Sequence, residues 1–395
     1  MNSRERILTA LAHREPDRVP ISFGDPGFSG IFDHGPHGYR ALCAHLGVDG
    51  YEEPFSLKDD CGVVFNHDPR LTERLRGDLR LLLPGSSYQL VELPDGSVVD
   101  EWGLARHPSE AWYWDLKEDE SPLRDVQTMD EVRAYGHWPS RTDPAISAGV
   151  RTQALALREA GYSVWAIPSW AQDIFHNYAY TRGFSRWLMD MYENPSFYHA
   201  YTEFILQMDI EYLEAFLPHI SDLVDVVLLG EDLGTQQTPF MNPDMYREFC
   251  KPYHAQWTKA VHRLALNAAI ALHSCGNVFP LIPDFIEIGV SILNPVQPKA
   301  RMMEPWRLKK EFGRDLTFLG GFDTQDLLPH GLPAEVRDGA RELIDTYGPG
   351  GGFIFCPSHQ IQADVPPENV VAMYDAAYEY GWYPLGRERA TAGAR

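Results

Sequence analysis

Two short stretches of the sequence end in side chains that bind soft metal ions. In IALHSCGNV (270–278) an apolar run leads into His273 and Cys275, and in GFIFCPSH (352–359) a second apolar run leads into Cys356 and His359. Residues two apart in an extended chain point to the same face, so the first pair offers an imidazole and a thiolate on one side. Zinc accepts such donors, and a catalytic zinc site combines three protein ligands with one open position. The sequence therefore predicts a half-site at His273 and Cys275 that either Cys356 or His359 completes.

Packing is the alternative interpretation of both stretches. A histidine and a cysteine at the end of a strand can fill space and hydrogen-bond to a carbonyl group, and one such pair is a weak signal. Cys356 lies inside the apolar run FIFCP, where a cysteine usually behaves as a small hydrophobic residue. Residue types alone leave metal binding and simple packing both open.

Other apolar runs also end in polar side chains. Glu231 and Asp232 follow DVVLLG, Asp323 follows LTFLGGF, and Gln297 follows SILNPV. Charged groups are costly to bury unless they bind something, so their gathering at run ends favours a functional site. The alternative is that the three acids stabilise the N-termini of the helices that follow them.

These residues must be positioned by an alternation of short apolar runs and longer helical patterns. Runs that are apolar on both faces are typical of parallel strands covered by helices, and this many repeats predict an α/β fold of the (β/α)8 barrel type. In such a barrel, catalytic residues lie at the C-terminal ends of the strands, which is where the residues above fall. The predicted strands are 18–24, 162–169, 225–232, 267–274, 291–296, 316–323 and 352–358, and the predicted helices are 195–218, 243–263, 278–288, 304–312, 333–347 and 367–380.

One segment interrupts this alternation. Residues 78–104 carry alternating patterns around the turn signal PDG, which predicts an antiparallel hairpin inserted before the main alternation. The acidic, aromatic stretch 107–144 is expected to be a surface excursion. We therefore predict a single barrel domain over 1–385, with 78–104 as an insertion, and a disordered polar tail over 386–395.

Composition excludes several classes of protein. The 395 residues include 44% hydrophobic ones, enough for a sizeable core, and the formal net charge of −22 disfavours nucleic acid and anionic membranes as partners. No apolar run approaches the roughly 20 residues that span a bilayer, and the N-terminus reads as a short amphipathic helix without an export signal. Five cysteines without a CxxC pair fit a reducing compartment, so a cytoplasmic location is expected.

Longer motifs resemble the uroporphyrinogen decarboxylase superfamily. They are RERILTALAHREPDRVPI (4–21), GEDLGTQQTPFMNPDMYREFCKPYH (230–254), HSCGNVFPLIPDFIEIGVSILNPVQ (273–297), LGGFDTQ (319–325) and PSHQIQADVPPENVVAMYDA (357–376). The resemblance covers about residues 3–382 and implies a (β/α)8 barrel. The superfamily includes porphyrinogen decarboxylases and zinc-dependent methyltransferases that exchange a methyl group with a corrinoid protein. The arginine-rich motif RQAGRY of true decarboxylases is missing from 23–40, so the chain looks closer to the methyltransferase branch.

The resemblance also bears on the third metal ligand. The methyltransferases have an HxC pair that His273 and Cys275 match, and a later cysteine whose place falls on His359 in this sequence, three residues after Cys356. The third ligand is then a histidine in place of the cysteine, or Cys356 from three residues earlier, or the site is degenerate. True decarboxylases also have a histidine there, which keeps a metal-free enzyme as an alternative.

The resemblance implies a zinc-dependent methyltransferase as the first hypothesis. Zinc would polarise the heteroatom that carries the methyl group, and Glu231, Asp232 or Asp323 would complete the coordination or deliver a proton. A small methylated substrate, such as a methoxyaromatic compound, would lie against side chains chosen from Trp170, Phe175, Tyr178 and Gln297, although core packing explains the aromatic residues equally well.

The same hypothesis implies a protein partner. The chain lacks the motif DxHxxG of corrinoid-binding proteins, so the cobalamin would belong to a separate corrinoid protein. A metal-free decarboxylase-type lyase and a non-catalytic binding barrel are the alternative functions, and a homodimer is one assembly that the sequence leaves open.

Overall fold

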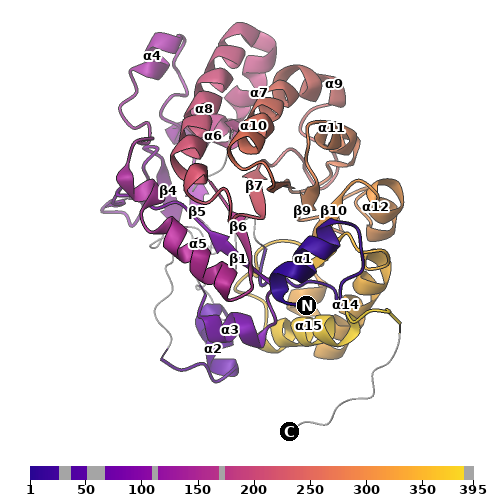
Figure 1. The fold of residues 1–395 in the computed structure, drawn as a ribbon. Helices are drawn as coiled ribbons and strands as arrows, with labels where there is room; N and C mark the ends of the chain where they lie inside the picture. Colours follow the sequence, from indigo (N-terminus) through magenta and orange to yellow (C-terminus); the bar gives the residue numbers. More distant parts are fainter. Residues whose placement is uncertain (26–36, 51–66, 109–113, 169–173, 387–395) are drawn as a thin grey trace.

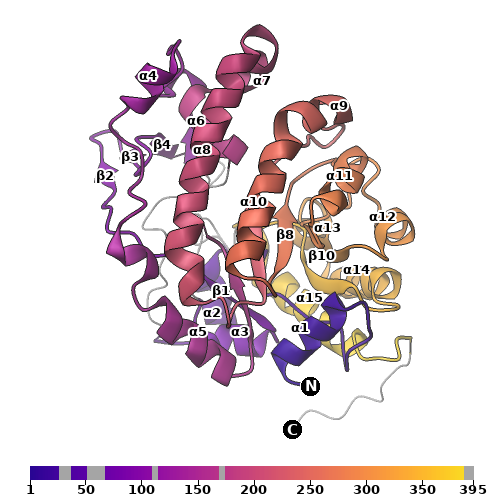
Figure 2. The same ribbon diagram turned by 45° about the horizontal axis from the view of Figure 1, so that its top comes forward.

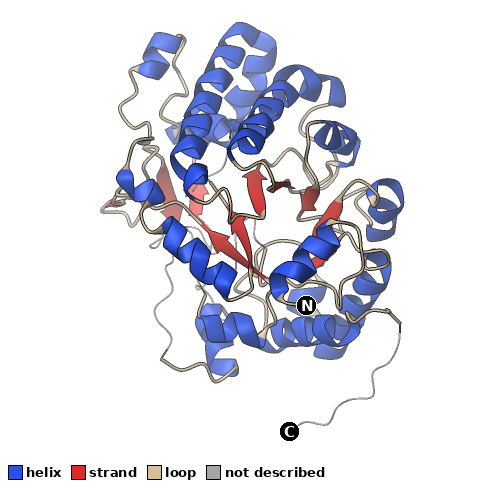
Figure 3. Cartoon of the chain, in the orientation of Figure 1, coloured by secondary structure: helices blue, strands red, loops and turns tan. Residues whose placement is uncertain are grey.

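The computed structural model describes residues 1–25, 37–50, 67–108, 114–168 and 174–386. Seven parallel strands form its central sheet, with helices around them (Figures 1 and 3). Most residues of these strands are buried, as expected for parallel strands covered by helices, and in β1 the two end residues, Leu79 and Leu82, are buried. In sheet order the strands are β1 (Leu79–Leu82), β6 (Ser163–Ala166), β7 (Val226–Gly230), β8 (Ala269–His273), β9 (Ile292–Asn294), β10 (Thr317–Phe322) and β11 (Phe353–Pro357).

The strand ends that carry the predicted site lie next to one another. Gly230 of β7 pairs with His273 of β8, and His273 pairs with Asn294 of β9. The carboxyl ends of these three neighbouring strands therefore form one edge, and the residues that follow them share it.

The predicted helices are present in the structure, some shortened or interrupted, together with further helices that were not predicted. The helices predicted over 333–347 and 367–380 are confirmed with the same bounds as α14 and α15, and α8 and α10 lie side by side on the outside of the sheet (Figure 2). The described helices are α1 (Ser3–Leu11), α2 (Tyr39–His45), α3 (Pro69–Arg74), α4 (Met129–Arg133), α5 (Val150–Glu159), α6 (Ile174–Arg182), α7 (Phe184–Glu193), α8 (Pro195–Phe216), α9 (Pro243–Met245), α10 (Lys251–Leu264), α11 (Ile282–Glu287), α12 (Pro305–Phe312), α13 (Leu327–His330), α14 (Pro333–Tyr347) and α15 (Pro367–Tyr380). A π-helical turn, Tyr246–Cys250, joins α9 to α10, and 3₁₀ turns cover Glu118–Glu120, Pro144–Ser147, Leu217–His219 and Phe279–Leu281.

The predicted strand at 18–24 is present only as isolated bridges. Ser22 donates its backbone N–H to Phe355 O (2.9 Å), and Phe355 donates to Pro20 O (2.9 Å). On the other side, Asp78 donates its backbone N–H to Ile21 O (2.7 Å) just before β1 begins. This extended segment thus connects β11 to the entrance of β1, the two ends of the sheet.

The segment 78–104, predicted as one hairpin, is divided between two sheets. Its first part, Leu79–Leu82, is strand β1 of the parallel sheet, and that part of the prediction is wrong. The charged Arg80 is one of the four residues of this strand. In the structure the Arg80 guanidinium turns back to Gly77 O and Leu79 O and lies over the Tyr162 ring at 3.7 Å, so these contacts accommodate a charge that is largely buried.

The remainder of that segment contributes to a small antiparallel sheet, with the PDG turn between its first two strands. Gly96 in this turn donates its N–H to Leu93 O (3.0 Å). The strands, in sheet order, are β2 (Val91–Glu92), β3 (Val98–Val99), β4 (Ala105–Pro108) and β5 (Trp114–Leu116).

Helix α1 lies across the N-terminal ends of the strands. Ile7 of α1 is fully buried and belongs to the apolar cluster inside the sheet, together with Trp165, Leu228 and Ile354. Arg4 of α1 donates its backbone N–H to Gly161 O (2.8 Å), shortly before β6 begins, so α1 covers the N-terminal ends of the strands. The opposite, C-terminal edge carries the candidate site.

Within the described part of the chain, no helix combines the length and the apolar character needed to cross a membrane. The predicted tail lies almost entirely outside the described residues.

Candidate metal centre

Three of the four predicted metal ligands come together at the C-terminal edge of the sheet. The ligand atoms of His273, Cys275 and His359 all lie within 4.8 Å of one another. His273 Nε2 is 3.5 Å from Cys275 Sγ, and the rings of His273 and His359 have centroids 6.1 Å apart. Zn–N and Zn–S bonds of roughly 2.1 and 2.3 Å at tetrahedral angles put two ligand atoms about 3.6 Å apart. The donor set and the spacing therefore fit a zinc ion, provided that His359 moves slightly closer to the other two ligands when the ion binds.

His273 is held by the strand that carries it and by two oxygen atoms at its other ring nitrogen. It is the last residue of β8 and is fully buried. Its Nδ1 lies 2.5 Å from Asn294 Oδ1 and 3.5 Å from Asp25 Oδ2. The ring is thus anchored at Nδ1, while Nε2 faces Cys275.

Cys275 lies in a tight turn directly after β8. Its backbone N–H donates to Asp232 Oδ1 (2.7 Å), and the next residue, Gly276, has φ +77° and donates to Gln297 Oε1 (3.0 Å). Burial raises the pKa of the Cys275 thiol well above its ordinary value, and the carboxylates of Asp232 and Asp25 raise it further. Without a cation the thiol is therefore protonated, and a metal ion that binds there must displace this proton.

His359 is the candidate third ligand that lies with this pair. Burial lowers the pKa of His359, and the resulting neutral imidazole is the form that binds metals. Cys356 instead is fully buried among the apolar side chains inside the sheet, with Leu319 and Ile354, and burial raises the pKa of its thiol well above the ordinary value. In this position Cys356 acts as a small hydrophobic residue.

Asp232 is the predicted acid that borders the three ligands. Its Oδ1 lies 3.9 Å from His273 Nε2, and its side chain is 33% exposed. Burial alone would raise the pKa of Asp232, but the nearby rings of His176 and His273 hold it below its ordinary value. Asp232 is therefore an ionised carboxylate beside the ligand group, within reach of solvent.

Glu231 is directed to the start of α6 instead. Its two carboxylate oxygens accept the backbone N–H groups of Phe175 (2.9 Å) and His176 (3.3 Å), and His254 Nε2 lies 3.8 Å away. Burial would raise the pKa of Glu231, yet its hydrogen bonds and charge interactions with His176 and His254 lower it. Glu231 is thus a carboxylate at a helix N-terminus, but the helix is α6, which precedes Glu231 in the chain, and not a helix that follows it as the alternative interpretation expected.

Asp323 takes the alternative role that the sequence left open, at the helix that follows it, α13. Its carboxylate accepts backbone N–H groups from Gln325 (2.9 Å), Asp326 (3.3 Å) and Leu327 (3.3 Å) and lies 3.4 Å from Lys299 Nζ. Its contacts are thus those of a helix cap paired with a lysine.

The predicted substrate-binding residues are placed mostly in the core. Phe175 is 1% exposed and packs against Trp187, and Tyr178 is fully buried and donates its hydroxyl to Asp190 (2.8 Å). Such buried rings do not line an open pocket. Gln297 Oε1 accepts the backbone N–H of Gly276, as described above, and the side-chain amide of Gln236 (2.6 Å). Trp170 lies outside the described residues.

Two residues of the site were missed in the sequence. Asp25 is fully buried beside His273, and it directly follows the predicted strand 18–24, so inspecting that strand end like the later ones would have found it. His176 accepts the backbone N–H of Asp232 at Nε2 (3.4 Å) and lies 3.1 Å from Gly230 O at Nδ1. His176 lies in the first turn of α6, and nothing in the sequence around it indicates a role in the site.

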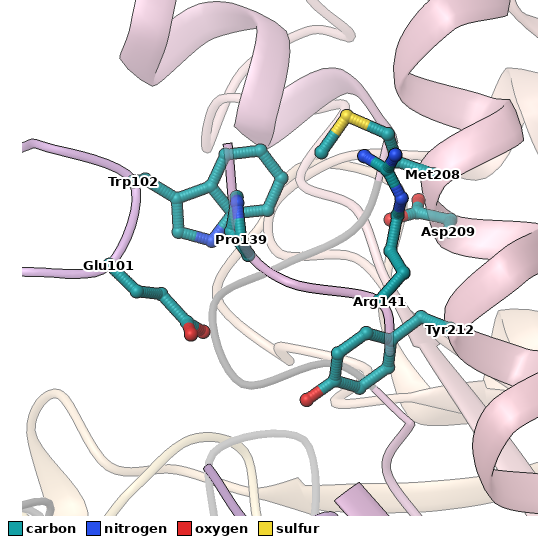
Figure 4. A pocket seen from close by; sticks show the side chains of 7 residues that line it. All are labelled: Glu101, Trp102, Pro139, Arg141, Met208, Asp209 and Tyr212. Carbon is teal, nitrogen blue, oxygen red and sulfur yellow. The ribbon is translucent and has the colours of Figure 1, made fainter. Parts of the chain in front are cut away.

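Two cavities lie away from this centre and share no lining residue with it. The smaller, about 20 Å³, is bordered by Trp102, Arg141 and Tyr212 (Figure 4) and has room for little more than a water molecule. The larger, about 230 Å³, is bordered by Tyr88, Trp138 and Tyr212. Neither cavity brings a ligand to His273, Cys275 or His359.

Known proteins resemble this chain over its second half in particular. A model of the family described as Uroporphyrinogen decarboxylase (URO-D) matches residues 175–380. A uroporphyrinogen decarboxylase of Coxiella burnetii is 24% identical over 197 residues, which are 48% of this chain and 49% of that relative. A methylated-thiol–coenzyme M methyltransferase of Methanosarcina mazei is 26% identical over 161 residues, 40% of this chain and 39% of that relative. The chain thus matches half or less of the length of these curated relatives.

A solved structure extends the similarity to the whole chain. A methyltransferase from Methanosarcina mazei aligns with a TM-score of 0.63 at 17% identity, covering 96% of this chain and 99% of that one. At this identity the alignment shows that the two proteins share a fold.

Proposed function

Because this chain belongs to the uroporphyrinogen decarboxylase family, in the part near its methyltransferase branch, we propose that it is a zinc-dependent methyltransferase. It would move a methyl group between a small methylated substrate and a separate corrinoid protein. The observation that carries this proposal is the grouping of His273, Cys275 and His359 within 4.8 Å at the C-terminal edge of the sheet. Two imidazoles, one thiolate and an open position are the composition of a catalytic zinc site.

The residues of the chain have distinct parts in this proposal. His273, Cys275 and His359 would hold zinc, which when bound supplies Lewis-acid activation of the heteroatom that carries the methyl group. Asp232 accepts the backbone N–H of Cys275 and, as the partly exposed carboxylate of the site, would relay a proton from solvent to the departing group. Glu231 and Asp323 hold helices that border the site.

We also propose that the sheet closes into an eight-stranded barrel as a single domain. The hydrogen bonds of segment 18–22 with β11 and with Asp78 support this, because the segment occupies the place of an eighth strand. A closed barrel has one mouth at the C-terminal strand ends, and a corrinoid protein would bring its cobalamin to this mouth.

The substrate is a small methylated compound. The name of the Methanosarcina mazei relative points to methylated thiols, and zinc activates both sulfur and oxygen leaving groups. A methoxyaromatic substrate loses support from Phe175 and Tyr178, because both are core residues.

Metal analysis of the purified protein tests this proposal. We expect about one zinc per chain, lost in His273→Ala and Cys275→Ala. Cys250→Ala is the matched control, since Cys250 is a fully buried cysteine in the core, and it should keep its zinc. Loaded protein should demethylate a methylated thiol or a methoxyaromatic compound in the presence of reduced cobalamin. A wild-type protein without zinc affinity, or equal zinc in the Cys275 and Cys250 variants, would contradict the proposal.

A metal-free lyase is the second candidate function. The similarity to uroporphyrinogen decarboxylases favours it. The family resemblance also implies a histidine at the position of His359 in true decarboxylases. Turnover of a carboxylated substrate by protein that has been stripped of metal would support this candidate over the first.

A further inference from the structure

Asn294 lies beside His273 at the metal centre. It is the last residue of β9, it is the register partner of His273 in the parallel pair β8–β9, and it is fully buried. Ser274 donates its backbone N–H to Asn294 O (2.8 Å), so the two strands are joined at this level. Register partners in parallel strands point to the same face, which brings the amide of Asn294 against the imidazole.

A backbone carbonyl sets the orientation of the Asn294 amide. Its Nδ2 donates to Leu319 O on the next strand, β10, at 3.2 Å. A carbonyl oxygen can only accept, so the side of the amide that faces Leu319 must be its NH2 group. The opposite orientation would bring two oxygens together in a buried position. Asn294 Oδ1 is therefore the atom that faces His273.

Two acceptors thus surround His273 Nδ1. Asn294 Oδ1 lies 2.5 Å away and Asp25 Oδ2 lies 3.5 Å away. A neutral imidazole carries one proton, and acceptors on one side draw that proton to Nδ1. The lone pair is then on Nε2, the nitrogen that lies 3.5 Å from Cys275 Sγ.

We infer that Asn294 is a positioning residue that selects the Nδ1–H tautomer of His273, with Leu319 O as the anchor that orients it. Selection of this tautomer presents the Nε2 lone pair to the ligand group before any metal arrives. The consequence for zinc affinity rests on the proposed function, whereas the tautomer itself does not.

The tautomer can be measured in metal-free protein by NMR with ¹⁵N-labelled histidine. His273→Gln identifies the His273 signals by their loss. In the wild type the bonded proton should be on Nδ1, and in the near-isosteric Asn294→Leu variant the Nε2–H form should gain population. A wild-type proton on Nε2, or an unchanged tautomer in Asn294→Leu, overturns the inference. Asn294→Ala provides the same readout if the leucine variant does not fold.

Zinc affinity measured by competition with a chromophoric chelator tests the consequence. Loss of a partner that orients a ligating histidine typically weakens binding about 10- to 100-fold, which we expect for Asn294→Leu. The matched control is Asn369→Leu, because Asn369 is 2% exposed and also donates to backbone carbonyls, those of Leu328 and Gly331. It should lose stability but bind zinc like the wild type.

The two proposals fail in different ways. If Asn294→Leu binds zinc as tightly as Asn369→Leu does, Asn294 has only a structural role and the inference is wrong. If the wild type binds no zinc, the proposed function fails, while the NMR measurement on metal-free protein still decides the role of Asn294.

Discussion

Replacement of the two candidates for the third ligand separates a metal ligand from a packed cysteine. His359→Ala removes a ring that lies with His273 and Cys275, whereas Cys356→Ala removes a thiol that is enclosed among apolar side chains inside the sheet. The two positions are three residues apart, so a general disturbance of this segment should affect both variants alike.

The two substitutions should differ in their effects on the Kd for zinc and on the free energy of unfolding. Structural zinc sites with four protein ligands bind with about 10–16 kcal/mol, or roughly 3 kcal/mol per ligand, so His359→Ala should raise the Kd for zinc at least about 100-fold. Cys356 is 0% exposed, and loss of its sulfur leaves a small cavity that should lower the free energy of unfolding by about 1 kcal/mol. Its zinc affinity should equal that of the wild type.

Two measurements on the same preparations of His359→Ala and Cys356→Ala test these expectations. Chelator competition gives the Kd for zinc, and urea unfolding of the metal-free protein gives the change in stability. Loss of zinc in Cys356→Ala together with tight binding in His359→Ala would refute the ligand assignment. Wild-type zinc affinity in both variants would show that neither side chain is a ligand.

Three further predictions concern the stability of the fold and the binding of zinc. Asp78→Asn should lower the free energy of unfolding by about 3–5 kcal/mol, because it leaves the buried guanidinium of Arg18 without its countercharge. In urea unfolding the exposed-pair control Asp375→Asn should lose less than about 1 kcal/mol, and equal losses in the two variants would contradict this account of the buried pair between Arg18 and Asp78. Gly276→Ala should weaken zinc binding and lower the free energy of unfolding by about 2 kcal/mol or more, because φ is +77° and the new Cβ would collide with the carbonyl oxygen of Thr235. A Gly276→Ala variant with wild-type stability and wild-type zinc affinity would contradict this prediction. Removal of zinc with a chelator should lower thermal stability by about 2.7 kcal/mol relative to protein at a free zinc concentration of 100 times Kd, and an unchanged melting temperature would speak against a zinc site in the folded protein.

Prediction from sequence was most successful where neighbouring residues carry the signal. The helices over 333–347 and 367–380 have the predicted bounds, since helical periodicity and terminal prolines are local features. Strand β1 was predicted as part of a hairpin, and only the ring of Tyr162 and the carbonyl groups near Arg80 explain how a charged residue is accommodated in a strand of the parallel sheet. Phe175 and Tyr178 were placed near a substrate by their position after a strand, but whether a ring faces a pocket or the core depends on what packs against it.

The amino-acid sequence by itself determined that this protein alternates strands with helices, and that His273 and Cys275 share one face at a strand end. The tertiary structure alone decided that His359 and not Cys356 joins them, and that Asp25 and Asn294 surround the ring of His273. The physical reason is the range of the interactions. Periodicity depends on residues a few positions apart, whereas contacts between side chains on different strands depend on the register and curvature of the whole sheet.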